Sequence, residues 1–206
     1  MGMSGRERAL RREDLLGDPV RQFIAWYGEA QAEGLPLPEA CALATASGAG
    51  RPSVRMVLMK EVDERGFVFG SSYASRKGRD LAENARAALL FYWHALGRQV
   101  RVEGSAERVA PEESDGIFLA RPRESRISAL ASRQSEPLAS REELEARVRE
   151  LGAELDGREV ERPPFWGGYR VVPDELEFWQ HRANRLHVRF VYRRSGDGWE
   201  IAQLQP

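Results

Sequence analysis

The segment from Ser71 to Lys77 gathers hydroxyl groups, two cations and an expected helix start within one short stretch of chain. Ser75 is well placed to cap the helix, and the free N–H groups of a helix start attract anions. Such a set of donors suits a phosphate monoester. The alternative is that Arg76 and Lys77 belong to an exposed helix start, where cations oppose the helix dipole and are mildly unfavourable without an anion.

A second pair of cations, Arg55 and Lys60, lies five residues apart at the two ends of an apolar segment. Because side chains alternate along a strand, the two cations are predicted to point to opposite faces. They are therefore expected to serve different anions or different contacts. Lys60 and Lys77 are the only lysines in the chain, which otherwise uses arginine.

Two further segments repeat the combination of guanidinium groups with hydroxyl or amide groups: Arg121-Pro-Arg-Glu-Ser125 and Arg133-Gln134-Ser135. They predict a second anion, or more contacts to the first. In a chain so rich in arginine, either segment alone is explained equally well as solvated surface.

The region from Phe178 to Arg189 is dense in side chains that bind or react. It holds two of the three histidines, a tryptophan and several spaced donors, among them Arg185 and His187. A single histidine in such a place is more often structural, but this density indicates a site.

Several common kinds of chemistry have no support in the sequence. It contains no glycine-rich dinucleotide motif, no P-loop, no nucleophile elbow and no His, Cys and carboxylate set with metal-ligand spacing. Cys41 is the single cysteine, so neither an intrachain disulfide nor a thiolate cluster can form. Hydrolysis, ATP use and metal catalysis are therefore not predicted.

The composition bounds the class of protein. A chain of 206 residues with 42% hydrophobic content and a net charge of −1 fits one domain over residues 1–206, and its charge gives no reason to expect nucleic acid as a partner. No segment approaches the roughly 20 apolar residues of a membrane span, and the charged N-terminus has no signal-peptide core. We expect a soluble, cytoplasmic protein with no membrane partner and a flexible arm over residues 1–17.

Periodicity distributes these residues over helices and short strands. Helices are predicted from near Pro19 to Gly34 and over 75–85, 112–119, 124–132 and 140–155. Strands are predicted over 40–46, 54–59, 67–69, 87–93 and 99–109, with two closing strands, 188–194 and 199–204, joined by a hairpin. Helices within and beside an antiparallel meander indicate a mainly β (α+β) class, a β-barrel rather than a doubly wound sheet.

Over roughly residues 38–206 these segments, in chain order, resemble the pyridoxamine 5′-phosphate oxidase family. The matching segments are Arg55-Met-Val-Leu-Met-Lys60, Ser75-Arg76-Lys77, Gly97-Arg-Gln99-Val, Arg121-Pro-Arg-Glu-Ser125, Arg133-Gln134-Ser135, Phe165-Trp-Gly-Gly-Tyr-Arg, Glu177-Phe-Trp179-Gln and Arg185-Leu-His187-Val-Arg189. The resemblance implies an FMN-binding split β-barrel that works as a homodimer, with the cofactor at the subunit interface.

Carried over by position, the resemblance implies two sets of contacts. The FMN contacts would be Arg55, Lys60, Ser71, Arg76, Lys77, Gln99, Gln134, Ser135, Trp179 and Arg189. The substrate phosphate would be held by Lys60, Arg121 and Ser125. Arg185 and His187 would lie over the substrate ring as the catalytic pair.

The implied activity is oxidation of pyridoxamine or pyridoxine 5′-phosphate to pyridoxal 5′-phosphate, with hydride transfer to the flavin and reduction of O₂ to H₂O₂. One alternative is an FMN oxidase of a secondary-metabolite pathway with a phenazine-type aromatic substrate. Flavin oxidases of phenazine biosynthesis share Gly50-Arg-Pro-Ser, Lys77-Gly-Arg-Asp-Leu, Ser132-Arg-Gln-Ser-Glu and Leu204-Gln-Pro. A second alternative is a flavin-binding protein without catalysis.

The sequence departs from the family mainly on the substrate side. Leu37 stands where an Asp is usual, Ile117 replaces a Tyr that helps hold the substrate phosphate, and Val188 replaces a polar residue. The family's N-terminal Arg-Glu-Tyr segment has no counterpart in residues 3–7. Among the cofactor positions, Gly70 is the clearest change. Loss of the Tyr hydroxyl removes one hydrogen bond to a charged group, worth about 1.5–3 kcal/mol.

Overall fold

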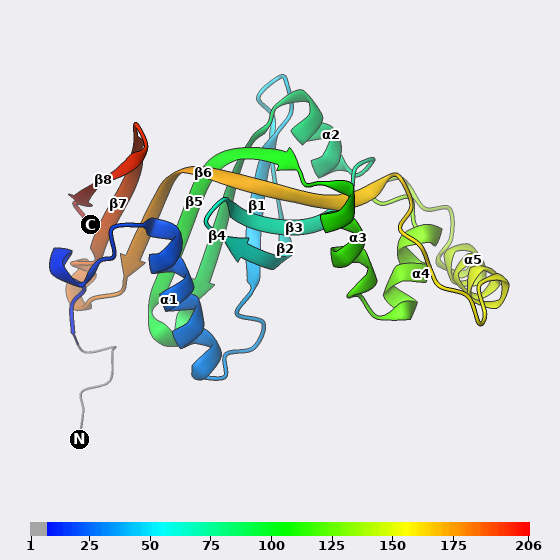
Figure 1. Cartoon of the computed structure of the whole chain (residues 1–206), viewed down its shortest axis with the longest axis horizontal. Helices are drawn as coiled ribbons and strands as arrows, with labels where there is room; N and C mark the ends of the chain where they lie inside the picture. The colour runs from blue at the N-terminus through cyan, green and yellow to red at the C-terminus, as the bar shows by residue number, and fades with distance from the viewer. Residues whose placement is uncertain (1–7) are drawn as a thin grey trace.

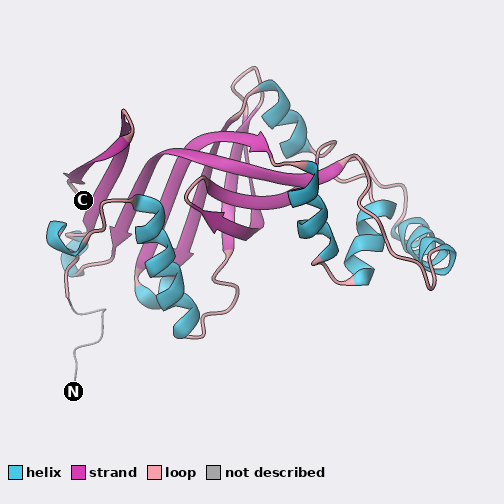
Figure 2. Cartoon of the chain, in the orientation of Figure 1, coloured by secondary structure: helices cyan, strands magenta, loops and turns pink. Residues whose placement is uncertain are grey.

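The computed structural model of the protein describes residues 8–206. Within them, eight strands form one antiparallel sheet in the order β3-β2-β1-β4-β5-β6-β7-β8. A further pairing of β3 with β6 closes the first six strands of this order into a barrel, and β7 and β8 extend beyond it (Figures 1 and 2). The predicted mainly β barrel with helices is therefore confirmed.

The strands are β1 (Ala40–Ala46), β2 (Pro52–Asp63), β3 (Gly66–Ser72), β4 (Arg86–Trp93), β5 (Arg98–Arg108), β6 (Trp166–Gln180), β7 (Val188–Ser195) and β8 (Gly198–Leu204). The α-helices are α1 (Pro19–Ala32), α2 (Arg76–Glu83), α3 (Pro111–Leu119), α4 (Arg123–Ala131) and α5 (Arg141–Glu154). Short 3₁₀ turns lie at Arg12–Asp14, His94–Leu96 and Ala183–Arg185.

Helix α1 covers the barrel and starts where local chemistry favours it. The Asp18 side chain accepts a hydrogen bond from the N–H of Arg21, and Pro19 occupies the first turn. The helix buries Phe23, whose ring lies 4.8 Å from Phe67 and 4.7 Å from Phe91 between ring centroids. These contacts join the helix to strands β3 and β4 in the main core.

Strand β6 was missed in the prediction, which placed only two strands after residue 155. Its first six residues are all buried, because one side faces the barrel and α3 packs on the other. A strand buried on both faces loses the polar and apolar alternation by which strands are recognised. Gly168 lets α3 approach, since a Cβ there would meet Val109 at 2.6 Å and Ile117 at 3.0 Å.

A smaller second core lies beneath α3, α4 and α5, away from α1. Phe118, Ile127, Val160 and Trp166 form its buried centre. The first residue of β6, Trp166, belongs to this second core, whereas later residues of β6 belong to the main core. The long strand thus joins the two packed regions (Figure 1).

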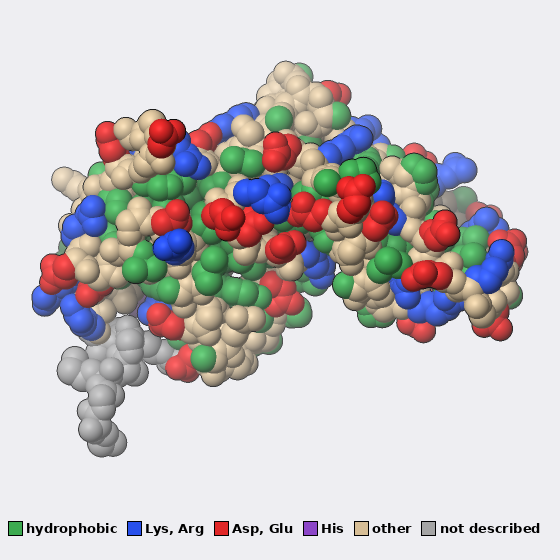
Figure 3. Space-filling model, viewed as in Figure 1, with side chains coloured by type: hydrophobic (Ala, Val, Ile, Leu, Met, Phe, Trp, Pro, Cys, Tyr) green, Lys and Arg blue, Asp and Glu red, His purple; other side chains and the backbone are tan. Residues whose placement is uncertain are grey.

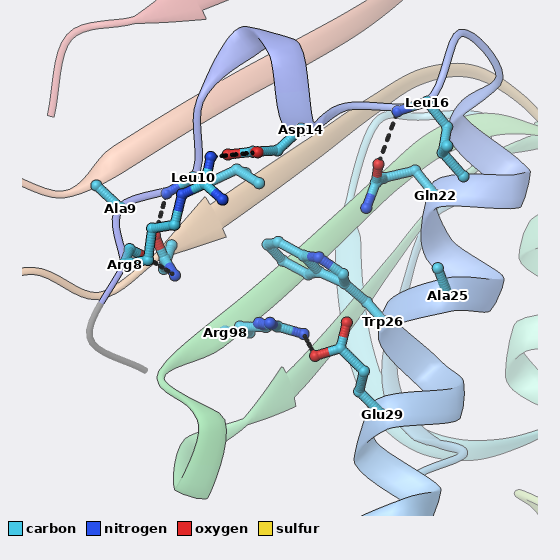
Figure 4. A pocket seen from close by; sticks show the side chains of 11 residues that line it. Arg8, Ala9, Leu10, Asp14, Leu16, Gln22, Ala25, Trp26, Glu29 and Arg98 are labelled. Carbon is cyan, nitrogen blue, oxygen red and sulfur yellow. Dashed lines mark hydrogen bonds and ion pairs between the residues drawn. The ribbon is translucent and has the colours of Figure 1, made fainter. Parts of the chain in front are cut away.

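The N-terminal segment from residue 8 is fastened to the far end of β6. The N–H of Leu10 donates to Gln180 Oε1 at 2.7 Å, and Gln180 Nε2 donates to the carbonyl of Arg8 at 3.1 Å. Beneath it lies a cavity of about 310 Å³ in which Arg98 stacks on Trp26 and pairs with Glu29 (Figure 4).

Residues 3–7, where the family's N-terminal motif was sought, lie outside the described residues. None of the helices in residues 8–206 is long and apolar enough to span a membrane.

Candidate active site

Six of the predicted binding residues line one cavity of about 460 Å³ between the barrel and α4. They are Lys60, Ser71, Lys77, Arg121, Ser125 and Gln134. The cavity wall also includes apolar side chains from β2 and the indole of Trp166. Segments that lie up to 110 residues apart in the sequence, from Met56 to Trp166, therefore meet in one place.

Lys77 is the buried cation of this cavity. Its Nζ donates to three neutral oxygens, Ser71 Oγ at 3.1 Å, Gln134 Oε1 at 3.3 Å and Ser75 Oγ at 3.4 Å. Burial, together with the nearby positive charge of Arg55, lowers the pKa of Lys77 to about 8. A buried cation bonded only to neutral groups is a binding site for an anion, because the anion would restore the lost stabilisation of its charge.

Arg55 and Lys60 point to opposite faces of β2, as the alternation predicts. Arg55 is partly buried and donates to Thr45 Oγ1 at 2.7 Å and Ser53 Oγ at 2.8 Å, whereas Lys60 is exposed. Asp80 accepts from Thr45 at 2.6 Å and lies 3.7 Å from Arg55. Sequence reasoning missed Thr45 and Asp80 as residues that fix the Arg55 guanidinium.

Arg121 provides a second cationic group in the same cavity. Its guanidinium lies 5.0 Å above the Trp166 ring, and burial lowers its pKa. Nη1 is buried and finds no hydrogen-bond partner in the part of the chain that the structure describes. A buried guanidinium nitrogen with an unmet donor favours binding of an anion at this position.

The absence of a side chain at Gly70 is explained by the close approach of Trp166 in the cavity wall. A Cβ at this position would lie 2.6 Å from the Trp166 ring and 3.4 Å from Ile117. The small residue therefore makes room for the indole on which Arg121 stacks. The two departures at Gly70 and Ile117 therefore lie next to each other, and Gly70 lines the cavity.

Three other predicted residues form a row across neighbouring strands. Gln99 on β5 pairs with Trp179 on β6, which in turn pairs with Arg189 on β7. The His187 ring lies 4.5 Å from Trp179 between centroids, and the N–H of Arg182 donates to His187 Nδ1 at 3.2 Å. Because Nδ1 accepts this hydrogen bond, Nε2 is the ring nitrogen that remains to face a ligand. His181, 5.2 Å from His187 between ring centroids, was not singled out in the sequence.

The remaining predicted residues lie near these two groups with less defined partners. Arg76 is exposed at the start of α2, and Ser135 is exposed with a left-handed backbone (φ 75°). Arg185 is also exposed and left-handed, with φ 61°, directly after Asn184 with φ 56°. Two consecutive left-handed residues form a strained turn, and this turn sets the direction in which the Arg185 side chain leaves the backbone.

The strained turn gives a prediction for Asn184, which tolerates the left-handed region better than most residues. We expect Asn184→Gly to keep turnover close to wild type, whereas Asn184→Ala lowers kcat about fivefold, the effect of roughly 1 kcal/mol of added strain. Flavin content should stay unchanged in both. The measurement is kcat and bound flavin on the same preparations, with Ala183→Gly as a control for loop flexibility. Equal damage by glycine and alanine would mean that the amide side chain is needed instead.

The cavity and the row lie at opposite ends of β6. Trp166, at the first end, lines the cavity, and Trp179 follows thirteen residues later. Along an extended strand that is about 43 Å, at roughly 3.3 Å per residue. The cavity and the row are therefore two separate groups of predicted residues within one subunit.

The closed six-stranded barrel with its flanking helices is the fold expected of a split-barrel flavoprotein. Residues 27–153 match the model for the pyridoxamine 5′-phosphate oxidase family, and residues 166–206 match the pyridoxine 5′-phosphate oxidase C-terminal dimerisation region. The chain belongs to the pyridoxamine 5′-phosphate oxidase family. It is accordingly an oxidoreductase with a flavin cofactor and a homodimer.

Relatives and solved structures agree with this assignment. A pyridoxine/pyridoxamine 5′-phosphate oxidase of Rubrobacter xylanophilus is 59% identical, over 92% of this chain and 87% of that protein. One from Paraburkholderia phymatum is 53% identical, over 94% and 91%. The structure of PhzG from Burkholderia lata 383, in complex with tetrahydrophenazine-1-carboxylic acid, superposes with a TM-score of 0.92 at 37% identity, covering 98% of this chain and 100% of that one.

Proposed function

We propose that the protein is an FMN-dependent oxidase that converts pyridoxamine and pyridoxine 5′-phosphate to pyridoxal 5′-phosphate. The observation that carries this proposal is a single cavity lined by three cationic side chains from different segments, Lys60, Lys77 and Arg121. Lys77, at the start of α2, suits the FMN phosphate, and Arg121 with Lys60 suits the phosphate of a second molecule. Two phosphate sites in one cavity match a phosphorylated cofactor beside a phosphorylated substrate.

The residues that line the cavity fit FMN, because cationic groups there have no anionic partner within residues 8–206. The Lys77 ammonium lacks an anionic partner among its hydrogen bonds, and Arg121 Nη1 has an unmet donor among the described residues. The Ser71 hydroxyl and the Gln134 amide are neutral groups beside Lys77, and Arg55 adds positive charge nearby. When bound, the flavin would accept a hydride and then react with O₂.

The other half-site would come from the partner subunit. Gln99, Trp179 and Arg189 would contact the flavin ring, and Arg185 with His187 would hold the substrate over it. His187 would offer a hydrogen bond through Nε2, because Nδ1 is already occupied by the N–H of Arg182. Closure by a second subunit would also exclude water from the reacting groups.

An exposed apolar face beside the cavity supports this arrangement. On the outer side of β2, Val54 is 68% exposed and Met56 is 65% exposed. Met56 lies in register with Ala42 on β1, which lies in register with Leu90 on β4. A contiguous apolar face of this kind is typical of a protein interface, and Met56 also lines the cavity. We infer that a second subunit covers this face and brings its row to the cavity.

The test is turnover by the FMN-loaded protein. Release of peroxide and formation of pyridoxal 5′-phosphate are expected with pyridoxamine 5′-phosphate and pyridoxine 5′-phosphate. The matched control is pyridoxine without the phosphate, for which kcat/KM should fall at least 100-fold because Arg121 and Lys60 lose their ligand. Bound FMN without turnover of either phosphorylated compound would overturn the proposal.

One observation favours a second candidate, an oxidase of a phenazine-type aromatic substrate. PhzG is similar over nearly the whole chain, and Met56, Leu58 and Trp166 give the cavity wall an apolar part that suits an aromatic substrate. In that case, peroxide release should occur with a reduced tricyclic carboxylate and not with the phosphorylated pyridines. The same assay with both substrate classes separates the two candidates.

A further inference from the structure

Glu177 is a buried carboxylate beside the row formed by Gln99, Trp179 and Arg189. Its side chain is 3% exposed. Its two oxygens accept from Arg189, Nε to Oε1 at 2.6 Å and Nη2 to Oε2 at 3.0 Å. Arg101, its neighbour in register on β5, also pairs with Oε2 at 3.0 Å. One carboxylate thus serves two arginines.

The paired contact fixes the plane of the Arg189 guanidinium. A bidentate pair sets both distance and orientation, which a single contact does not. Arg189 Nη1 also donates to the carbonyl of Gln205 at 3.1 Å, so the guanidinium is held from two sides. Its position relative to Trp179 is therefore decided by Glu177 and the C-terminal segment before any ligand arrives.

The surrounding charges form a ladder across β5, β6 and β7. Arg101 also pairs with Glu175 at 3.3 Å and with Glu103 at 3.0 Å, and Arg193 pairs with Glu175 at 2.8 Å. Acidic and basic side chains are interspersed over the face in view in Figure 3. Within this ladder Glu177 contacts Arg189 directly, whereas Glu175 lies two residues further from Trp179 on the same face of β6.

We propose that Glu177 is a positioning residue that holds Arg189 against the flavin and, through its negative charge, limits how strongly the site favours the reduced cofactor. This inference rests on the proposed function, in which Arg189 contacts the flavin. Reduction adds negative charge to a flavin, and a fixed cation nearby stabilises that charge. A buried carboxylate on the same cation opposes the effect, and burial keeps the opposition from being screened.

The experiment measures the midpoint potential of the bound flavin in the FMN-loaded protein. Glu177→Gln keeps the size of the side chain and removes its charge. We expect reduced flavin to be bound about tenfold more tightly relative to oxidised flavin, a positive shift of about 30 mV for a two-electron couple. The matched control is Glu175→Gln, which removes the same charge from the same face without touching Arg189 and should shift the potential far less.

A second variant, Glu177→Asp, keeps the charge but shortens the reach to Arg189, so it should weaken flavin binding and leave the potential near that of wild type.

An unchanged potential in Glu177→Gln, or an equal shift in both glutamine variants, would overturn the role of Glu177 while leaving the proposed function intact. If Glu177→Gln does not fold, Glu177→Asp decides the matter, and wild-type flavin affinity in that variant contradicts the positioning role. Failure of the wild-type protein itself to bind FMN would count against the proposed function instead.

Discussion

Replacing Lys77 by methionine is expected to weaken FMN binding about 100-fold and to make the cofactor-free protein more stable. A hydrogen bond from a charged donor contributes about 1.5–3 kcal/mol to binding. We expect the upper end of this range for Lys77 because the site is buried. The gain in stability follows because Lys77 is a cation buried among neutral oxygens, a cost that a methionine of similar length does not have. We expect an increase in Tm of about 3 °C, the effect of roughly 1 kcal/mol in a domain of this size.

The pH dependence of stability provides an independent measurement of the same effect. The pKa of Lys77 in the folded protein is about 8, below its ordinary value of 10.5. Between these two values the unfolded chain binds more protons at this group, so the stability of the cofactor-free protein rises with pH from about 8 to 10.5. Thermal unfolding should show that Lys77→Met lacks this rise. Lys60→Met, which changes the exposed lysine of the same cavity, is the control and should leave stability unchanged. An unstabilised Lys77→Met variant that still binds FMN tightly would contradict the assignment.

Mixing two inactive variants is expected to restore activity. One variant carries Lys77→Met, in the cavity, and the other carries Arg185→Ala with His187→Ala, beside the row. In a symmetric dimer with composite sites, a mixed dimer contains one centre with both half-sites intact and one with both damaged. Purified mixed dimers are therefore expected to show about half of wild-type turnover, and an equal mixture that exchanges subunits at random about a quarter.

The design has an internal control. Mixing each variant with itself must leave turnover near zero, and two variants damaged in the same half-site, Lys77→Met and Arg121→Met, must not complement each other. The measurement is turnover after co-refolding or co-expression with two affinity tags, so that only mixed dimers are assayed. No recovery in purified mixed dimers would mean that both half-sites act within one subunit, against the separation of Trp166 and Trp179 along β6.

The sequence allowed much of the cavity to be predicted, because its residues carry chemistry that can be recognised in short segments. Ser71, Lys77 and Arg121 are identified by residue type alone, and Ser75 caps α2 as expected. Residues that hold a predicted binding residue in place, without themselves contacting a ligand, were harder to find. Asp80 and Glu177 resemble ordinary surface carboxylates until the fold buries them beside Arg55 and Arg189.

Two features of the fold were beyond sequence reasoning for a physical reason. Strand β6 is buried on both sides over its first half, so the alternation that would indicate a strand is absent. The left-handed backbone at Asn184 and Arg185 depends on how the turn is held between β6 and β7, which no local pattern records. The separation of the cavity from the row also required the fold, because the sequence does not show that one long strand runs between them.

Strand β6 pairs with different strands along its length, and this has a consequence for how the dimer can deform. Residues 166–172 include those that pair with β3 of the barrel, and residues 175–180 pair with β7. One continuous strand therefore reaches the cavity at one end and carries the row at the other. In the proposed dimer, whose centres combine the cavity of one subunit with the row of the other, we expect bending of this strand to displace a part of both centres at once.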